Sequence, residues 1–280
     1  MDQEKQIDEI DSQWSKKQLV MRQFGDKASA YSTSVIHSKG QSLSRLIELL
    51  EPDSNLIMLD IATAAGHTAH ALAPYVREAV GLDITIDMLR VASAEAKRKG
   101  LENVVHLAAD AERLPFACER YDLVTCRIAA HHFTHVSLFM TEVARVLRAD
   151  GRLAIVDNVV PGSSYRARKK QKDYNVGRYV NAFESLRDPG HNSCLSLEEW
   201  QEQFYQAGFQ ILHQETAGKE IELSEWAARM KVTPENTTRL KVMLLQAPGE
   251  VADFLLPAIQ GEQIKFRLTE MLMIGRLWRA

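Results

Sequence analysis

The chain has 280 residues, of which 45% are hydrophobic and 25% charged, a composition typical of a soluble globular protein with a sizeable core. Its formal net charge is −3 and its sequence pI is about 6.3. The basic residues form no stripe of the kind that binds nucleic acid, and a short basic run at 166–172 is interpreted as a solvated helix face. These numbers argue against a nucleic-acid partner.

The three cysteines, Cys118, Cys126 and Cys194, form no C-x-x-C pair, so the sequence supports neither a disulfide framework nor a zinc site. The first residues are polar and acidic, and no apolar run approaches about 18 residues. We therefore expect no signal peptide and no membrane span, and predict a cytoplasmic protein.

From residue 56 onward, short apolar runs alternate with amphipathic segments. This pattern predicts strands at 56–61, 78–83, 104–108, 121–126 and 152–160, separated by helices at 68–75, 85–99 and 136–147. The last of these strands is apolar almost throughout, as expected when helices cover both faces. Together they predict an α/β fold with a doubly wound, mainly parallel, Rossmann-like sheet.

Three segments flank this predicted core, which we place at 51–160. Residues 1–50 are expected to form an N-terminal helical cap, and the polar, turn-rich residues 161–195 an inserted cap. Residues 196–280 are expected to complete the sheet, with strands at 209–216 and 263–278 and a helical insertion between them.

Aspartates follow three successive predicted strands: Asp60, Asp83 and Asp110. In a doubly wound sheet the ligand lies beyond the carboxyl ends of the strands, so these side chains share one rim. Asp83 follows Asp60 by 23 residues, close to the spacing of about 20 expected for an acid that binds ribose hydroxyls. Each alone would be interpreted as a helix cap or turn residue. Jointly they predict a ligand site.

The motif Asp60-x-Ala62-x-Ala64-x-Gly66 resembles the D-x-G-x-G-x-G loop of class I S-adenosylmethionine-dependent methyltransferases. Segments GLDIT (81–85), AADAERLPF (108–116), YDLVTCR (121–127) and EVARVLRADGRLAIVD (142–157) look like the later motifs of that family, in order. The segment AAHHF (129–133) is similar to the branch near the ubiquinone and menaquinone C-methyltransferases, and the chain most closely resembles the bacterial YcgJ-like methyltransferases.

This resemblance implies S-adenosyl-L-methionine as cofactor, with S-adenosyl-L-homocysteine as product, and makes 51–160 the cofactor-binding core. Asp83 is expected to accept the ribose hydroxyls, which suits a carboxylate with two acceptor oxygens. Asp110 and the Ala111 amide are expected at the adenine amine. The full set implied by position is Tyr31, Asp60, Ala62, Ala64, Gly66, Asp83, Ile84, Met88, Asp110, Ala111, Cys126 and Arg127, with Phe24 and Gly40 as further candidates.

Ala62 and Ala64 stand where the family has glycine. A left-handed backbone costs a non-glycine residue about 1–2 kcal/mol. Alanine is therefore compatible either with a loop that keeps negative φ or with a loop that absorbs the strain. Because alanine adds only a methyl group, we expect cofactor binding to be retained.

The implied reaction is in-line methyl transfer to a small or medium organic acceptor, a carbon or oxygen nucleophile such as a quinol or phenol. His131 and His132 follow the fourth strand, where the acceptor would meet the cofactor, and are the candidate general bases. Adjacent side chains point in different directions, so at most one is expected to reach the cleft. The other interpretation is packing or capping.

His131 and His135 stand four residues apart, but no further ligand cluster accompanies them, and no metal site is predicted. The acceptor site is expected between the N-terminal segment and 161–195, with Tyr174, Tyr179 and Phe183 either as its walls or as ordinary packing residues.

Two rival functions stay open. An NAD-dependent dehydrogenase would need G-x-G-x-x-G after the first strand, which Ala62–Gly66 fits poorly. A non-catalytic protein that binds S-adenosylmethionine or S-adenosylhomocysteine is compatible with the two alanines. The oligomeric state is open, with a homodimer as one candidate.

Overall fold

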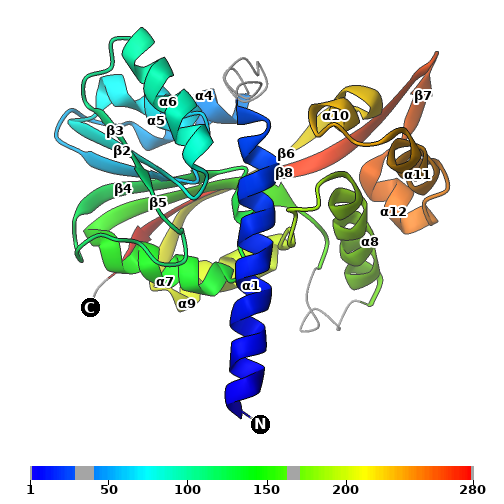
Figure 1. The fold of residues 1–280 in the computed structure, drawn as a ribbon, viewed down its shortest axis with the longest axis horizontal. Helices are drawn as coiled ribbons and strands as arrows, with labels where there is room; N and C mark the ends of the chain where they lie inside the picture. Colours follow the sequence, from blue (N-terminus) through cyan, green and yellow to red (C-terminus); the bar gives the residue numbers. More distant parts are fainter. Residues whose placement is uncertain (1, 29–40, 163–170, 279–280) are drawn as a thin grey trace.

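One continuous sheet forms the centre of the protein (Figure 1). The computed structural model describes residues 2–28, 41–162 and 171–278. The strand order is β3-β2-β1-β4-β5-β8-β6, with β7 paired to β8. The strands are β1 (Ile57–Ile61), β2 (Glu78–Asp83), β3 (Val104–Ala108), β4 (Tyr121–Arg127), β5 (Leu147–Val159), β6 (Phe209–Glu222), β7 (Ala258–Gln260) and β8 (Gln263–Leu277).

The pairing confirms the predicted doubly wound sheet. Strands β1 to β5 are parallel to one another, whereas β8 runs antiparallel to β5 and β6 runs antiparallel to β8. Strand β1 lies between β2 and β4, so the chain winds outward in both directions from this point. A crevice opens at such a switch point, beyond the carboxyl ends of the strands, because the connections leave on opposite sides.

Helices cover both faces of the sheet (Figure 1). Because successive strand side chains alternate between faces, Met58 packs with Leu46 and Leu72 on one side, while Leu59 packs with Phe139 on the other. The helices are α1 (Asp2–Gly25), α4 (Gln41–Leu50), α5 (His67–Leu72), α6 (Ile86–Arg98), α7 (Val136–Val146), α8 (Gln171–Arg187), α9 (Leu197–Gln206), α10 (Leu223–Arg229), α11 (Pro234–Leu245) and α12 (Gly249–Leu255), with 3-10 turns at Ala73–Tyr75 and Ala130–His132. No helix in the described ranges is both long and apolar enough to cross a membrane.

Strands β6 and β8 continue well past the end of β5. The β5–β8 pairing ends at Val159 and Thr269, whereas the β6–β8 pairing runs on to Glu222 and Lys265. Around this extension pack α8, α10, α11 and α12, with a hydrophobic cluster of their own in which Phe183 stacks on Trp226 and Phe266 meets both rings edge-on. Figure 1 shows this lobe on the right of the sheet.

Helix α1 passes in front of the sheet between its β1–β3 half and the α8 lobe (Figure 1). Polar contacts tie it to both sides. Lys17 Nζ bonds Asp110 Oδ2 at 2.6 Å, and Gln23 Nε2 donates to Asp188 Oδ1 at the end of α8. The helix therefore closes one side of the crevice.

The local patterns predicted the core elements to within a few residues, and the main differences lie outside it. Residues 161–195, predicted to be turn-rich, contain α8, and β6 runs six residues beyond its predicted end at 216. The extra part of β6 is held by β8, a partner distant in sequence that a local pattern does not report.

Gly275 lies near the end of β8, where this strand is flanked by β5 and β6, and we predict that it is required for the packing of α9. A Cβ at this position would lie 2.7 Å from Cδ1 of the buried Phe204 ring. Gly275→Ala should lower the free energy of unfolding by about 1–3 kcal/mol through overpacking. Urea denaturation measures the effect.

The matched control is Gly249→Ala, because a Cβ there meets nothing within 4 Å and the residue begins helix α12. It should be neutral or slightly stabilising. Equal effects of the two substitutions would contradict the packing argument.

Candidate functional site

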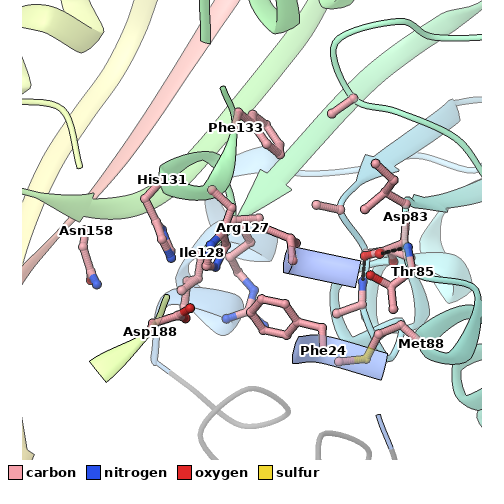
Figure 2. Close-up of a pocket in the computed structure, with 18 of the residues that line it drawn as sticks. Phe24, Asp83, Thr85, Met88, Arg127, Ile128, His131, Phe133, Asn158 and Asp188 are labelled. Carbon is pink, nitrogen blue, oxygen red and sulfur yellow. Dashed lines mark hydrogen bonds between the residues drawn. The ribbon is translucent and has the colours of Figure 1, made fainter. Parts of the chain in front are cut away.

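One large cleft opens at the switch point. It has about 1560 Å³ of space, including the part open to solvent, and is lined by residues from the ends of β1, β2 and β4 and from helices α1, α8 and α10. Figure 2 shows Asp83, Thr85 and Met88 at one end, His131, Asn158 and Asp188 at the other, and Phe24 and Arg127 between them. Segments far apart in sequence thus meet around one cavity.

The loop after β1 is left-handed at alternate residues. The φ angles are 54° at Ala62, 48° at Ala64 and 83° at Gly66. These are the three positions at which the D-x-G-x-G-x-G frame has glycine, so the loop follows the strained path rather than a path of negative φ. At Gly66 a side chain is also excluded by space, because a Cβ would lie 2.4 Å from the His70 ring.

Asp60 holds this loop from below. Its carboxylate accepts hydrogen bonds from the Thr63 hydroxyl (2.6 Å), the Thr125 hydroxyl (2.7 Å) and the Ala69 amide (3.2 Å). The side chain is buried, and burial raises its pKa to about 6 against the opposing effect of these donors. Asp60 therefore joins β1, the loop, α5 and β4.

Asp83 fastens the loop from the side. Its Oδ2 accepts from the Ala64 amide at 2.9 Å and its Oδ1 from the Thr85 amide at 2.8 Å, the two bonds dashed in Figure 2. The Thr85 hydroxyl and the Ile84 amide also act as donors to this carboxylate. Burial raises the pKa of Asp83, while the amide donors oppose that shift.

Asp110 is paired with a residue of the N-terminal helix. Lys17 Nζ lies 2.6 Å from Asp110 Oδ2 and 2.8 Å from Glu112 Oε2. Glu112 also accepts from the Thr134 and His135 amides, which fixes the loop before α7. Burial alone would lower the pKa of Lys17, but the two acids outweigh it and raise that pKa.

The end of β4 contributes Arg127 and Ile128. Arg127 is buried and its Nε donates to the Thr68 hydroxyl at 3.0 Å. Ile128 has φ of 55°, a rare conformation for a β-branched residue, and such strain is concentrated at functional sites. Both line the cleft, whereas Cys126 is buried in the core and is absent from the described lining.

His131 forms a buried pair with Asp157 from β5. Its Nδ1 lies 2.6 Å from Asp157 Oδ1, and its amide donates to Asp157 Oδ2 at 2.9 Å. Burial alone would lower its pKa, but the charge and hydrogen bond of Asp157, with help from Glu184 and Asp188, raise it. This arrangement leaves the second ring nitrogen, Nε2, for another partner, and Figure 2 shows the ring facing the cleft.

His132 is held differently. Its Nδ1 bonds the carbonyl of Gly190 at 2.9 Å, and its ring meets the Phe24 ring edge-on at 5.1 Å between centroids. Burial, and then the neighbouring His131, lower its pKa to about 4. Both histidines line the cleft, but of the two it is His131 that is bonded to a carboxylate and has a raised pKa.

His135 precedes the first residue of helix α7, and its Nδ1 lies 3.6 Å from Glu112 Oε2. Its side chain is therefore directed to Glu112 and not to His131. Among the residues with described positions, no group of three or more His, Cys, Asp or Glu side chains is arranged to hold a metal ion.

Most of the residues predicted for the site line this cleft. They are Asp60, Ala62, Ala64, Asp83, Ile84, Met88, Asp110, Ala111, Arg127, His131 and His132, together with Phe24. Gly66 shapes the loop from outside the lining. Tyr31 and Gly40 lie outside the described residues. The individual roles of all these residues stay predictions.

The aromatic residues proposed as acceptor walls do not line the cleft as described. Phe183 is buried beside Trp226 and Phe266, and the Tyr179 hydroxyl donates to the Met243 carbonyl. In their place stand residues that the sequence did not single out: Lys17, Glu184, Arg187, Asp188, Lys219, Trp226 and Arg229. No motif marks them, because they converge from α1, α8, β6 and α10 only in the folded chain.

Comparison with known proteins identifies the family to which this chain belongs. Residues 52–211 match the family described as "Methyltransferase domain". The chain is 36% identical over 256 residues to the methyltransferase YcgJ of Bacillus subtilis, covering 90% of this chain and 96% of that protein. The crystal structure of that YcgJ protein superposes with a TM-score of 0.77 at 34% identity, covering 85% of this chain and 99% of the other. A ubiquinone/menaquinone biosynthesis C-methyltransferase of Allorhizobium ampelinum is 32% identical over 118 residues, covering 40% of this chain and 46% of that protein.

We predict that the alanines of the loop reduce stability. Ala62→Gly and Ala64→Gly should each raise the free energy of unfolding by about 1 kcal/mol, because glycine adopts positive φ without steric cost. Chemical denaturation measures the change.

Ala65→Gly is the control within the same loop, because Ala65 is buried and is not among the residues with positive φ. It should destabilise the fold by about 1 kcal/mol through loss of a buried methyl and gain of chain entropy. A loss of stability in all three variants would show that the loop is not strained at Ala62 and Ala64.

Proposed function

Since the chain belongs to the methyltransferase-domain family and is an S-adenosylmethionine-dependent methyltransferase, we propose that it methylates a carbon or oxygen nucleophile of a small or medium organic acceptor. The observation that carries the proposal is the His131–Asp157 pair, whose histidine ring lines the cleft at the end away from Asp83. A histidine held in this way can accept the proton that such an acceptor loses.

The residues at the other end fit S-adenosylmethionine. Asp83 presents two buried carboxylate oxygens at this end of the cleft, which suits the two ribose hydroxyls. Ile84 and Met88 lie beside it as apolar contacts for the adenine. Asp110 would accept from the adenine amine while Lys17 remains on Glu112. The cofactor, when bound, supplies an electrophilic methyl group on a sulfonium.

Arg127 would bind the methionine carboxylate of the cofactor. It lines the cleft near Thr68 and Asp60, and burial, the largest influence, lowers its pKa while the Asp60 charge opposes that shift. An arginine keeps its charge under these conditions and presents several donors in one plane. A carboxylate ligand would carry the charge opposite to that of this arginine.

His131 is assigned the base and His132 a packing role. Asp157 fixes the Nδ1 side of the His131 ring, so Nε2 remains to take a proton from the acceptor. Helix α1, with Phe24 against His132, limits the entry of water and aligns the two reactants. The chain's own residues therefore orient the acceptor and remove its proton.

A quinol- or phenol-like acceptor suits such a base, because an imidazole of raised pKa removes an acidic hydroxyl proton near neutral pH. The similarity to a C-methyltransferase of ubiquinone and menaquinone biosynthesis supports the same chemistry.

A second candidate is a protein that binds the cofactor without catalysis, favoured by the strained Ala62 and Ala64. It predicts cofactor binding with no turnover on quinol, phenol or amine acceptors. The His131–Asp157 pair favours the enzyme, since a protein that only binds has no use for a basic group there.

Asp83→Asn should weaken S-adenosylhomocysteine binding about tenfold or more, because an amide has one acceptor oxygen in place of two. Calorimetric titration measures the affinity. Asp87→Asn is the matched control: Asp87 is an exposed acid nearby whose partner is Arg90, and surface pairs contribute little. Unchanged affinity in Asp83→Asn would remove Asp83 from the cofactor site.

His131→Asn should lower kcat by about 10²–10⁴-fold at saturating cofactor. His213→Asn should leave kcat unchanged, because His213 lies on β6 and pairs with Glu215. Wild-type rates in His131→Asn would exclude it as the base.

Activity should fall at low pH as His131 becomes protonated. Since its folded pKa is raised above the ordinary 6.5, the acid-side midpoint of kcat should lie above that value. Asp157→Asn removes the charge that raises this pKa, so the midpoint should move to lower pH. Thermal unfolding confirms that the variant is folded. A midpoint that stays in place would show that another group controls the rate.

A further inference from the structure

The end of the cleft farthest from Asp83 has an apolar wall with one lysine in it. Ile221 of β6, Leu268 of β8 and Trp226 of α10 line this end, and all three are buried. They belong to the extension of β6 and β8 that passes beyond β5. The contacts proposed for the methionine and adenine groups of the cofactor lie elsewhere in the cleft. This wall is therefore left for the acceptor.

Lys219 lies on the apolar face of that extension. It is paired directly with Leu268, and Ile221 is paired with Phe266, so the four side chains share one face of the β6–β8 strand pair. Its side chain is 34% exposed and lines the cleft. A lysine in this position places its ammonium at the cavity rather than in bulk solvent.

The charge of Lys219 is only weakly compensated within the protein. Its nearest described carboxylate oxygen belongs to Glu270, at 4.0 Å, and within the described ranges its ammonium makes no hydrogen bond to protein. Burial lowers its pKa; Arg127 and Arg229 act in the same direction, while Glu270 and Glu184 oppose it. An anionic ligand would stabilise this cation.

The neighbouring charges define the kind of anion. Arg187 is already engaged, because its Nε donates to the Trp226 carbonyl and its guanidinium lies 4.5 Å from the Trp226 ring centroid. Glu184 is buried at the His131 side of the cleft, with its Oε1 unbonded. Arg127 and Arg229 add positive charge beside Lys219, and Glu270 and Glu184 offset it, so a carboxylate matches the one ammonium that no described protein group bonds.

We propose that Lys219 binds a carboxylate of the acceptor, whose apolar body lies against Ile221, Trp226 and Leu268. The acceptor is therefore an organic acid with an apolar ring or chain. This inference rests on the proposed function and deepens it. It predicts that the enzyme distinguishes an acid from the neutral compound of the same shape.

The test uses the full chain saturated with S-adenosylhomocysteine and three pairs of probes: benzoate, 4-hydroxybenzoate and 1-naphthoate, each with its neutral amide. Calorimetry measures the affinities. At least one acid should bind about tenfold more tightly than its amide, as a charge-assisted hydrogen bond requires. If no acid in the panel binds better than its amide, the proposal is wrong, whatever the variants do.

Variants then assign the preference to a residue. Lys219→Met should abolish it, and Lys219→Arg should keep it. Lys265→Met is the matched control, because Lys265 lies on the opposite face of the β6–β8 strand pair and its side chain pairs with Glu220. Retention of the acid preference in Lys219→Met would overturn the proposal.

The affinity for S-adenosylhomocysteine alone distinguishes a failure of this inference from a failure of the proposed function. It should be the same in Lys219→Met as in the wild type. A fall would assign Lys219 to the cofactor carboxylate and overturn the inference while supporting the proposed function. No binding of S-adenosylhomocysteine to the wild type would instead overturn the proposed function.

Discussion

The buried carboxylate of Asp60 is the contact on which the cleft depends. It joins the end of β1 to the following loop, to the start of α5 and to β4, through three protein donors. An apolar residue there would leave two hydroxyls and an amide without this partner in the core. With Asp60 in place, the loop can hold left-handed residues at alternate positions, and this backbone presents the Ala64 amide to Asp83. The hydrogen bonds of the buried Asp60 thus stabilise the strained conformation of the loop.

The cleft combines an end formed by the loops after β1 and β2, proposed for the cofactor, with an end assembled from distant segments, proposed for the acceptor. Helix α1 bridges them: Lys17 bonds the acids after β3, Phe24 packs on His132, and Gln23 bonds Asp188 beyond α8. His131, the proposed base, is buried in this enclosure, and its partner Asp157 comes from β5 in the sheet. Geometry and basicity are therefore set by the same contact.

The sequence was sufficient for the fold, and it brought the residues proposed for the cofactor to one cleft, because both depend on local patterns. Apolar runs marked β1 to β5, and the acids at their ends, Asp60, Asp83 and Asp110, fell on one rim because parallel strands bring their carboxyl ends together. The handedness of Ala62 and Ala64 was left open by the residues, since a methyl group tolerates either path at modest cost. The acceptor half was not predictable in this way. Lys219 and Glu184 reach the cleft through nonlocal pairing of β6 with β8 and packing of α8, and neither belongs to a motif.

The central claim is that one cleft places S-adenosylmethionine beside His131. A crystal structure of the protein with S-adenosylhomocysteine tests it most directly. The account predicts both ribose hydroxyls within hydrogen-bond distance of Asp83 and the cofactor sulfur directed along the cleft toward His131 Nε2. A cofactor bound elsewhere, or a sulfur directed away from His131 with no path for an acceptor between them, would contradict it.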